Sequence, residues 1–261
     1  MIRVNNVWKS YDEVTVLKGL SLDIPASQTT VILGRSGVGK SVLLRQIAGL
    51  EMPDSGEIEI DGVNLRSIGG KARKQYISKI GMLFQSSALF DSMTIEENVA
   101  FALLHHHSAS SIEQQSIRNA VDEALYKVGL EGHQKKYPSE LSGGQKRRAA
   151  LARLIIYKPQ ILLFDEPTTG LDPITASQIS ALISTTQKSL GGTAIVVTHD
   201  IVSAVSIGDY FALHHEGRIT IHGGREEFLS SQDPTLHQFI TSALVPDDSV
   251  HLIQNAVRGA K

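Results

Sequence analysis

The residues with the clearest chemical meaning form a glycine-rich loop, Gly34-Arg35-Ser36-Gly37-Val38-Gly39-Lys40-Ser41. The loop follows an apolar, strand-like segment at 30–33 and precedes a helix-like segment at 42–48. Glycines let backbone N–H groups approach phosphate oxygens, and the first turn of a helix adds the positive end of its dipole. In this context Lys40 would reach the β- and γ-phosphates of a nucleotide, and the Ser41 hydroxyl would coordinate Mg²⁺. The motif therefore predicts a phosphate-binding loop.

A pair of carboxylates, Asp165 and Glu166, follows the apolar segment 161–164. A buried strand of an open α/β sheet delivers such side chains at its carboxyl end, where ligands bind. Asp165 suits a role on Mg²⁺, either directly or through water, and Glu166 is placed to act as general base on an attacking water. Alone, the pair would equally suit an ordinary surface turn. The phosphate loop in the same chain favours the catalytic interpretation.

A second anion site is predicted at Leu141-Ser142-Gly143-Gly144-Gln145, directly before a helix-like segment at 146–156. Its serine lies 23 residues before Asp165 (165 − 142). A hydroxyl, two glycines and a new helix N-terminus can together bind a phosphate. Kinases and GTPases have no counterpart to this segment, so it separates the chain from other enzymes that carry a phosphate loop.

Strands and helices must position these residues. Continuous apolar runs predict strands buried on both faces of a mostly parallel sheet, whereas alternation at 57–60 and 218–221 predicts a half-exposed antiparallel edge. Helix-type segments between the strands suit crossover connections. The segments with β-type patterns are 2–7, 20–24, 30–33, 58–60, 80–84, 161–164, 194–197, 210–213 and 218–221.

The middle of the chain, from about 95 to 157, has no strand-like segment. Apolar residues there have helical spacing, and Gly129 follows them as a C-terminal stop: Ile117, Ala120, Val121, Ala124, Leu125 and Val128. We predict an α/β fold with a P-loop NTPase (RecA-like) core, an antiparallel β edge and an inserted α-helical subdomain. The predicted boundaries are 2–242 for one domain, with the core at 2–85 and 159–242, the helical subdomain at 86–158 and a C-terminal extension at 243–261.

Composition excludes several classes of protein. The 261 residues contain no cysteine, which rules out disulfides and Cys-ligated metals. No apolar run approaches the roughly 20 residues of a membrane-spanning helix, and the first residues lack the apolar stretch of a secretory signal. The net charge is −2 and the densest cationic cluster, 146–148, is short. We therefore expect no nucleic-acid partner, and we expect any membrane role to come through other proteins.

With these motifs in this order, the sequence resembles the ATP-binding subunits of ABC transporters over about residues 2–242. The resemblance implies ATP and Mg²⁺ as cofactors and ATP hydrolysis coupled to transport. It also assigns further roles. Tyr11 would stack on adenine, Gln85 would be the glutamine switch, Asp172 in Gly170-Leu171-Asp172 would belong to a loop that communicates between sites, and His199 would sense the γ-phosphate.

Each of these smaller motifs has a plainer alternative. Tyr11 could merely cover the core, Gln85 could be an ordinary loop amide, and His199 could be structural only. On the resemblance, the expected catalytic residues are Glu166, His199, Gln85 and Lys40, and the expected Mg²⁺ ligands are Ser41, Gln85 and Asp165. The expected ATP-binding residues are Tyr11, Gly34, Arg35, Ser36, Gly37, Val38, Gly39, Lys40, Ser41, Val42, Ser142, Gly143, Gly144, Gln145 and Asp172.

The resemblance also implies partners. Two copies of the subunit would pair head to tail, each ATP lying between the phosphate loop of one copy and the 141–145 signature of the other. The homodimer would sit on the cytoplasmic face of the inner membrane, bound to an integral membrane permease. In ABC subunits the segment after the glutamine switch forms the cleft for that permease. Leu89, Phe90 and Met93 could contribute to this socket or to the subdomain core.

The amino-acid sequence of segments 40–44 and 136–144 is most similar to that of the Mla/Mce-type lipid-transport ATPases. This resemblance implies phospholipid or another hydrophobic cargo and an Mce-type lipid-binding partner. Gln145 departs from that group, which often has Met there. A polar-solute importer, such as one for amino acids, is the first alternative. A soluble ABC ATPase of DNA repair or translation would need a second cassette or a long coiled coil, and a small-molecule kinase would leave the signature unexplained.

Overall fold

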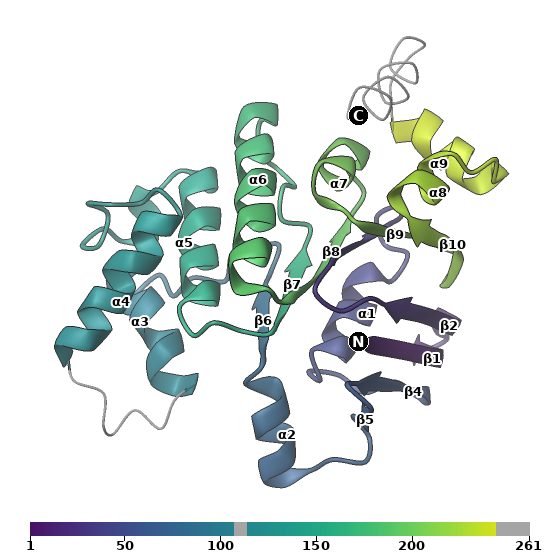
Figure 1. Cartoon of the computed structure of the whole chain (residues 1–261), viewed down its shortest axis with the longest axis horizontal. Coiled ribbons are helices and arrows are strands. Elements are labelled where there is room, and N and C mark those ends of the chain that lie inside the picture. The colour runs from purple at the N-terminus through teal and green to yellow at the C-terminus, as the bar shows by residue number, and fades with distance from the viewer. Residues whose placement is uncertain (107–113, 244–261) are drawn as a thin grey trace. The chain divides into compact units, whose positions relative to one another are not determined.

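The computed structural model of the chain describes residues 1–106 and 114–243 (Figure 1). The contacts within the chain divide it into two compact units, unit 1 with residues 1–69 and 195–261 and unit 2 with residues 70–194. Of the predicted C-terminal extension, residues 244–261 lie outside the described residues.

Unit 1 contains an antiparallel sheet in the order β2-β1-β4-β5 and a second set of neighbouring strands in the order β10-β9-β3-β8. β8 begins two residues before the second segment of the unit. The elements are β1 (Ile2–Tyr11), β2 (Val14–Ile24), β3 (Thr29–Leu33), α1 (Lys40–Ile47), β4 (Ser55–Ile60), β5 (Val63–Asn64), β8 (Thr193–Thr198), α7 (Ile201–Ile207), β9 (Tyr210–His215), β10 (Arg218–Gly224), α8 (Arg225–Leu229) and α9 (Pro234–Ala243).

The burial of these strands follows from their sequence patterns. Every residue of β3 and β8 is buried, as their continuous apolar runs require. β1 and β2 instead alternate, and their inward residues form part of the core. β3 runs parallel to β9, whereas β9 and β10 are antiparallel. This arrangement places the carboxyl end of β3 directly before the glycine-rich loop.

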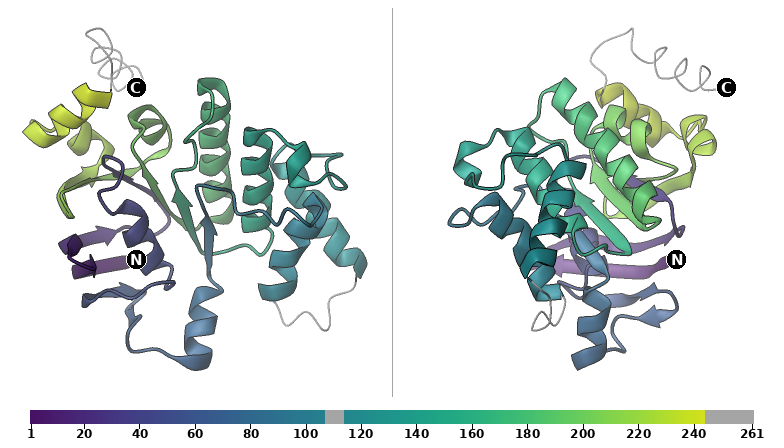
Figure 2. Two further views of the ribbon diagram at one scale, coloured as in Figure 1. Left: turned by 180° about the vertical axis from the view of Figure 1, so that it is seen from behind. Right: turned by 60° about the vertical axis from the view of Figure 1, so that its left-hand side comes forward.

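Unit 2 is mainly helical, with one parallel pair of strands formed by β6 and β7. Helices α5 and α6 pack side by side, and α3 and α4 both contact α5, as Figure 2 also shows. The elements are α2 (Gly70–Ile77), β6 (Ile80–Leu83), α3 (Ile95–His106), α4 (Gln114–Lys127), the 3₁₀ helix η2 (Pro138–Glu140), α5 (Gly143–Ile155), β7 (Ile161–Asp165) and α6 (Pro173–Leu190).

The predicted elements are largely confirmed. Eight of the nine predicted strand segments lie within strands, and the ninth, 80–84, extends one residue beyond β6. The predicted helix before Gly129 is α4, which ends at Lys127, and Gly129 follows two residues later with a φ of 68°. β10 is an antiparallel end strand with alternating exposure, as expected. β4 is antiparallel but is not an edge, because the two-residue strand β5 pairs with it on the outer side. β5 is too short for its sequence to indicate a strand.

Among the described residues, none of the helices combines the length and the apolar character needed to cross a membrane.

Candidate functional site

The glycine-rich loop in unit 1 connects β3 to α1, as predicted. Lys40 is the first residue of α1, and its side chain is only 5% exposed. Its Nζ donates hydrogen bonds to the carbonyl oxygens of Gly34, at 2.8 Å, and Arg35, at 2.9 Å. These hydrogen bonds hold the ammonium group inside the loop and compensate for its removal from water.

Two glycines of the loop are required by the elements packed beneath it. A Cβ atom on Gly34 would lie 2.5 Å from the carbonyl oxygen of His214 in β9. A Cβ atom on Gly39 would lie 2.6 Å from Val16 Cγ1 in β2, and Gly39 also has a φ of 106°. Side chains at either position would displace the loop from the strands.

The geometry of the loop fits a polyphosphate. Its central residues, Arg35 to Gly37, are exposed. The N-cap of α1 is Gly39, which has no side chain that could cap the first backbone N–H groups of the helix. Together with the Lys40 ammonium, these donors suit phosphate oxygens.

His214 lies beneath this loop and was not predicted from the sequence. Its side chain is buried, and neither ring nitrogen has a hydrogen-bond partner among the described residues. Burial and, to a lesser extent, the nearby charges of Lys40 and His215 together lower the pKa of His214 to about 4. The imidazole is therefore neutral at pH 7 and acts as a packing group under Gly34 and Gly39.

Tyr11 and His199, the other predicted site residues of unit 1, are both exposed at the ends of strands. The Tyr11 hydroxyl donates to Glu51, and the Lys9 ammonium lies 5.3 Å from the centroid of its ring. Tyr11 is 39% exposed, so it is not a core residue. His199 directly follows β8, where the strand sequence predicted it.

The two predicted carboxylates lie in unit 2 at the end of β7. Asp165 is its last residue and is 8% exposed, while Glu166 follows and is 7% exposed. Glu166 has a φ of 46°, a left-handed conformation that is uncommon for a residue with a side chain. Its Oε2 accepts a hydrogen bond from Thr169 Oγ1 at 2.9 Å. The position and orientation of this carboxylate are thus both constrained.

The signature segment begins α5, and its serine and glutamine form a capping box. Ser142 Oγ accepts from the Gln145 backbone N–H at 3.3 Å, and Gln145 Oε1 accepts from the Ser142 backbone N–H at 3.0 Å. A methionine at 145 could not complete this box, which gives Gln145 a structural role. Gly144 is buried, and a Cβ there would lie 2.5 Å from Thr175 Cγ2 of α6. Ser142 and Gly143 remain exposed.

Asp172 is the N-cap of α6. Its Oδ1 accepts from the Thr175 backbone N–H at 3.0 Å, and hydrogen bonds from Thr175 lower the pKa of this carboxyl. Because Thr175 also packs on Gly144, the predicted communication loop and the signature helix meet at one residue.

Two arginines of α5 hold the segment around Gln85. Arg147 Nη1 donates to the carbonyl oxygens of Phe84, at 2.8 Å, and Gln85, at 2.6 Å. The Arg147 side chain is buried, and this desolvation lowers its pKa. Arg153 donates to the carbonyls of Ser87, at 3.0 Å, and Ala88, at 2.7 Å. The Gln85 side chain itself is exposed.

The sequence did not predict these arginine contacts. Arg147 belongs to the cationic cluster 146–148, which was considered only as a weak nucleic-acid signal. Helical spacing was an available signal, because Arg147 lies one turn before the buried Leu151 and two turns before Leu154. Ser87 and Ala88 have positive φ values of 64° and 46°. The arginines thus bind a segment of unusual backbone conformation.

The donors predicted for Mg²⁺ are a hydroxyl, an amide and a carboxylate, from Ser41, Gln85 and Asp165. Oxygen ligands of this kind suit Mg²⁺, which keeps several waters and commonly binds substrate phosphates as well. The described residues contain no cluster of three or more His, Cys, Asp or Glu side chains that could hold a metal by itself. Oxygen donors of this kind fit an ion that is bound together with a nucleotide.

A family model described as "ABC transporter" matches residues 17–169, which include the phosphate loop, Gln85, the signature and the carboxylate pair. The chain belongs to the ABC transporter family. The predicted fold class and the predicted class of enzyme, an ABC-type ATPase that binds ATP, are thereby confirmed.

Relatives in this family are named for two kinds of transport. The Escherichia coli K12 protein "Intermembrane phospholipid transport system ATP-binding protein MlaF" is 40% identical over 225 residues, which are 86% of this chain and 82% of MlaF. MlaF of Haemophilus influenzae is 38% identical over 92% of this chain and 90% of its own length. The Mycobacterium leprae "Probable ribonucleotide transport ATP-binding protein mkl" is 38% identical, and the match covers 92% of this chain and 68% of that protein.

Solved structures of ABC cassettes have the same fold. A dimeric bacterial ABC transporter cassette is 32% identical with a TM-score of 0.79, covering 86% of this chain and 99% of the cassette. A dimeric cassette in a post-hydrolysis state, bound to ADP and Pi, has 31% identity and the same TM-score and coverage. The individual roles predicted for the site residues of the present chain, and its domain boundaries, stay predictions.

The buried His214 makes the stability of the fold depend on pH. Its pKa is about 4 in the folded chain and about 6.5 when unfolded, so between these values the unfolded chain binds more protons and stability falls as pH falls. We expect the His214→Met variant to lose about 3 kcal/mol less unfolding free energy than the parent between pH 7 and pH 4. Urea unfolding at several pH values measures this, with the exposed His237→Gln as control. Parallel pH profiles for parent and His214→Met would contradict it.

The Arg147 contacts predict an effect on stability and on hydrolysis. Arg147→Met leaves the carbonyls of Phe84 and Gln85 without their buried donor, so the unfolding free energy should fall by about 2 kcal/mol. ATP hydrolysis should slow, while affinity for ATP, measured on the same sample, should change little. Lys146→Met removes the neighbouring charge and serves as control. If the two variants behave alike, Arg147 does not have this role.

Proposed function

We propose that this chain binds and hydrolyses ATP with Mg²⁺ as the ATPase subunit of an ABC transporter that moves phospholipid or another hydrophobic molecule. The observation that carries the ATPase half is the buried Lys40 ammonium inside a phosphate loop of the expected strand–loop–helix form. Membership of the ABC family supports the coupling to transport.

In the proposed reaction the chain positions the nucleotide and supplies one group that accepts a proton from the attacking water. Lys40 and the backbone N–H groups of the loop bind the β- and γ-phosphates, and Tyr11 stacks on the adenine. Glu166 accepts the proton of the attacking water, and its hydrogen bond from Thr169 orients the carboxylate for that role. Mg²⁺, held by Ser41, Asp165 and Gln85, would neutralise phosphate charge. His199 would contact the γ-phosphate.

We further propose that two copies of the chain share each nucleotide. The exposed Ser142 and Gly143, at the start of α5, offer a hydroxyl and a helix N-terminus to a phosphate. The dimeric cassettes with 31–32% identity support a dimer. Binding across an interface makes ATP stabilise the dimer, and loss of the γ-phosphate releases it.

For the cargo, the MlaF relatives support phospholipid, because they are named for intermembrane phospholipid transport and the matched region covers 82% and 90% of their lengths. A permease in the inner membrane, with the dimer on its cytoplasmic face, and an Mce-type lipid-binding protein would complete the system. The name of the mycobacterial relative, a ribonucleotide transporter, keeps a polar-solute importer as the second candidate.

The cargo is tested by purifying the complex in detergent with its native partners and extracting bound lipid. We expect co-purified phospholipid and an integral membrane partner. The absence of lipid, together with ATPase activity stimulated by a soluble solute, would assign the chain to the polar-solute importers.

Phe90 is the best candidate for the permease socket. It is 41% exposed, so it is not buried core, yet its surroundings are ordered. Its ring packs edge-on against Phe101, with centroids 4.8 Å apart, and Arg153 lies 5.8 Å from its centroid. Asn98 binds both the N–H and the carbonyl of Phe90. Leu89 and Met93 are half-buried beside it.

Glu166→Gln should leave ATP binding intact and slow hydrolysis by about 10²-fold or more, since general-base catalysis contributes on that scale. The variant should also accumulate as an ATP-bound dimer, detectable by size-exclusion chromatography. Hydrolysis near the parental rate by a pure sample would remove Glu166 from the role of base.

Phe90→Ala should weaken assembly with the permease by on the order of 1–3 kcal/mol, because an apolar side chain buried at an interface contributes that much. The isolated variant should keep its solubility and its affinity for ATP. Pull-down of the permease measures the effect. Val202→Ala, which truncates an exposed apolar residue of α7, serves as control. Loss of solubility or of ATP binding would instead identify Phe90 as a structural residue.

A further inference from the structure

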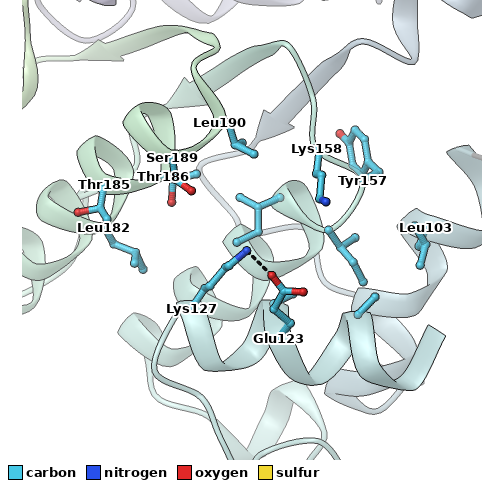
Figure 3. Close-up of a pocket in the computed structure, with 14 residues that line it drawn as sticks. Leu103, Glu123, Lys127, Tyr157, Lys158, Leu182, Thr185, Thr186, Ser189 and Leu190 are labelled. Atoms are coloured by element: carbon cyan, nitrogen blue, oxygen red, sulfur yellow. Dashed lines mark hydrogen bonds and ion pairs between the residues drawn. The ribbon is translucent and has the colours of Figure 1, made fainter. Parts of the chain in front are cut away.

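Unit 2 contains a half-open cavity of about 400 Å³ that none of the predicted nucleotide-site residues lines (Figure 3). Its walls come from α3, α4, the C-terminal parts of α5 and α6, and the turn after α5. Pockets that bind small molecules have volumes of about 300–1,000 Å³, so its size suits a ligand.

Much of the lining is apolar. Four helical elements contribute these side chains, and four of the side chains are buried. The apolar residues are Leu103, Ala120, Ala124, Ile155, Ile156, Leu182 and Leu190. The Tyr157 ring adds to the wall, because its hydroxyl donates to the Ile80 carbonyl oxygen at 3.1 Å rather than needing a partner in the cavity. Such a surface favours a hydrocarbon chain.

Charged groups line the same cavity with an excess of positive charge. Figure 3 shows Lys127 and Lys158 approaching it from different sides, with Glu123 beside Lys127. Lys127 Nζ and Glu123 Oε1 are 2.6 Å apart. This hydrogen bond lowers the pKa of the Glu123 carboxyl, as do the charges of both lysines, so Glu123 is ionised. Two ammonium groups against one carboxylate leave a net charge of +1.

We propose that this cavity binds an amphiphile with one anionic group and an apolar chain. The chain would occupy the apolar walls, and the anionic group would lie between Lys127 and Lys158. A nucleotide is a poor match, because a net charge of +1 does not compensate several phosphate charges and no glycine-rich loop lines the cavity. A cationic amphiphile is disfavoured by the same net charge.

The experiment uses the full chain and three probes with the same ten-carbon chain: decanoate, decanol and decylammonium. Binding is measured by titration calorimetry below the micellar concentration of each probe. For the parent we expect decanoate to bind about fivefold more tightly than decanol, the scale of a partly exposed charge pair, and decylammonium to bind more weakly still.

Two kinds of variant sharpen the test. In the double variant Lys127→Gln, Lys158→Gln the cavity keeps only Glu123, so its net charge becomes −1 and the preference should invert to decylammonium. Lys188→Gln removes a charge from α6 outside the lining and should keep the parental order of affinities. Ala120→Phe fills the cavity and should abolish binding of all three probes.

Thermal unfolding and ATP binding of each variant establish that it is folded, so a change of preference can be assigned to the cavity. Equal affinity of the parent for decanoate and decylammonium would overturn the proposal, as would an uninverted preference in the folded double variant or undiminished decanoate binding by Ala120→Phe. These outcomes are independent of ATP hydrolysis and of cargo.

Discussion

In unit 2, the segment around Gln85 and the signature helix α5 are joined by one buried charge, the guanidinium of Arg147. A charge removed from water is tolerated only when it is paired or hydrogen-bonded, and Arg147 meets this requirement with the carbonyls of Phe84 and Gln85. Because Arg147 belongs to the helix that Ser142 caps, the signature and the backbone of Gln85 are held by the same rigid element. A displacement of α5 would break these bonds or carry Gln85 with it.

Unit 1 also contains a buried charge, the ammonium group of Lys40. Its ammonium is buried and bonds to carbonyls of its own loop, while the loop can approach β9 and β2 only because Gly34 and Gly39 lack side chains. A nucleotide phosphate would offer Lys40 a stronger partner than a carbonyl. Each unit therefore has fixed polar groups around a position that an anion could occupy, and the groups that we propose for ATP hydrolysis are divided between the two units.

Most of the strands, the helices and the predicted site residues could be identified from the sequence, because short runs of adjacent residues carry both the motifs and the periodic patterns. The phosphate loop, the carboxylates at the end of β7 and the capped start of α5 were each indicated by a few adjacent residues. The burial of His214 and the contacts of Arg147 were not, since they depend on residues distant in the sequence: Gly34 lies 180 positions from His214 (214 − 34), and Gln85 lies 62 from Arg147. Gly144 was expected only to bind ATP, but it is also required for packing, because a side chain there would clash with Thr175 of α6.

The central claim is that one nucleotide needs Lys40 from one copy and Ser142 from another. Mixing Lys40→Ala protein with Ser142→Arg protein tests it most directly, because each variant alone should be inactive. In a mixed dimer with shared sites, one site carries both substitutions and the other carries neither, so ATP hydrolysis should return. Native mass spectrometry establishes that mixed dimers form. If they form and hydrolysis stays absent, the sites are not shared and the account is wrong.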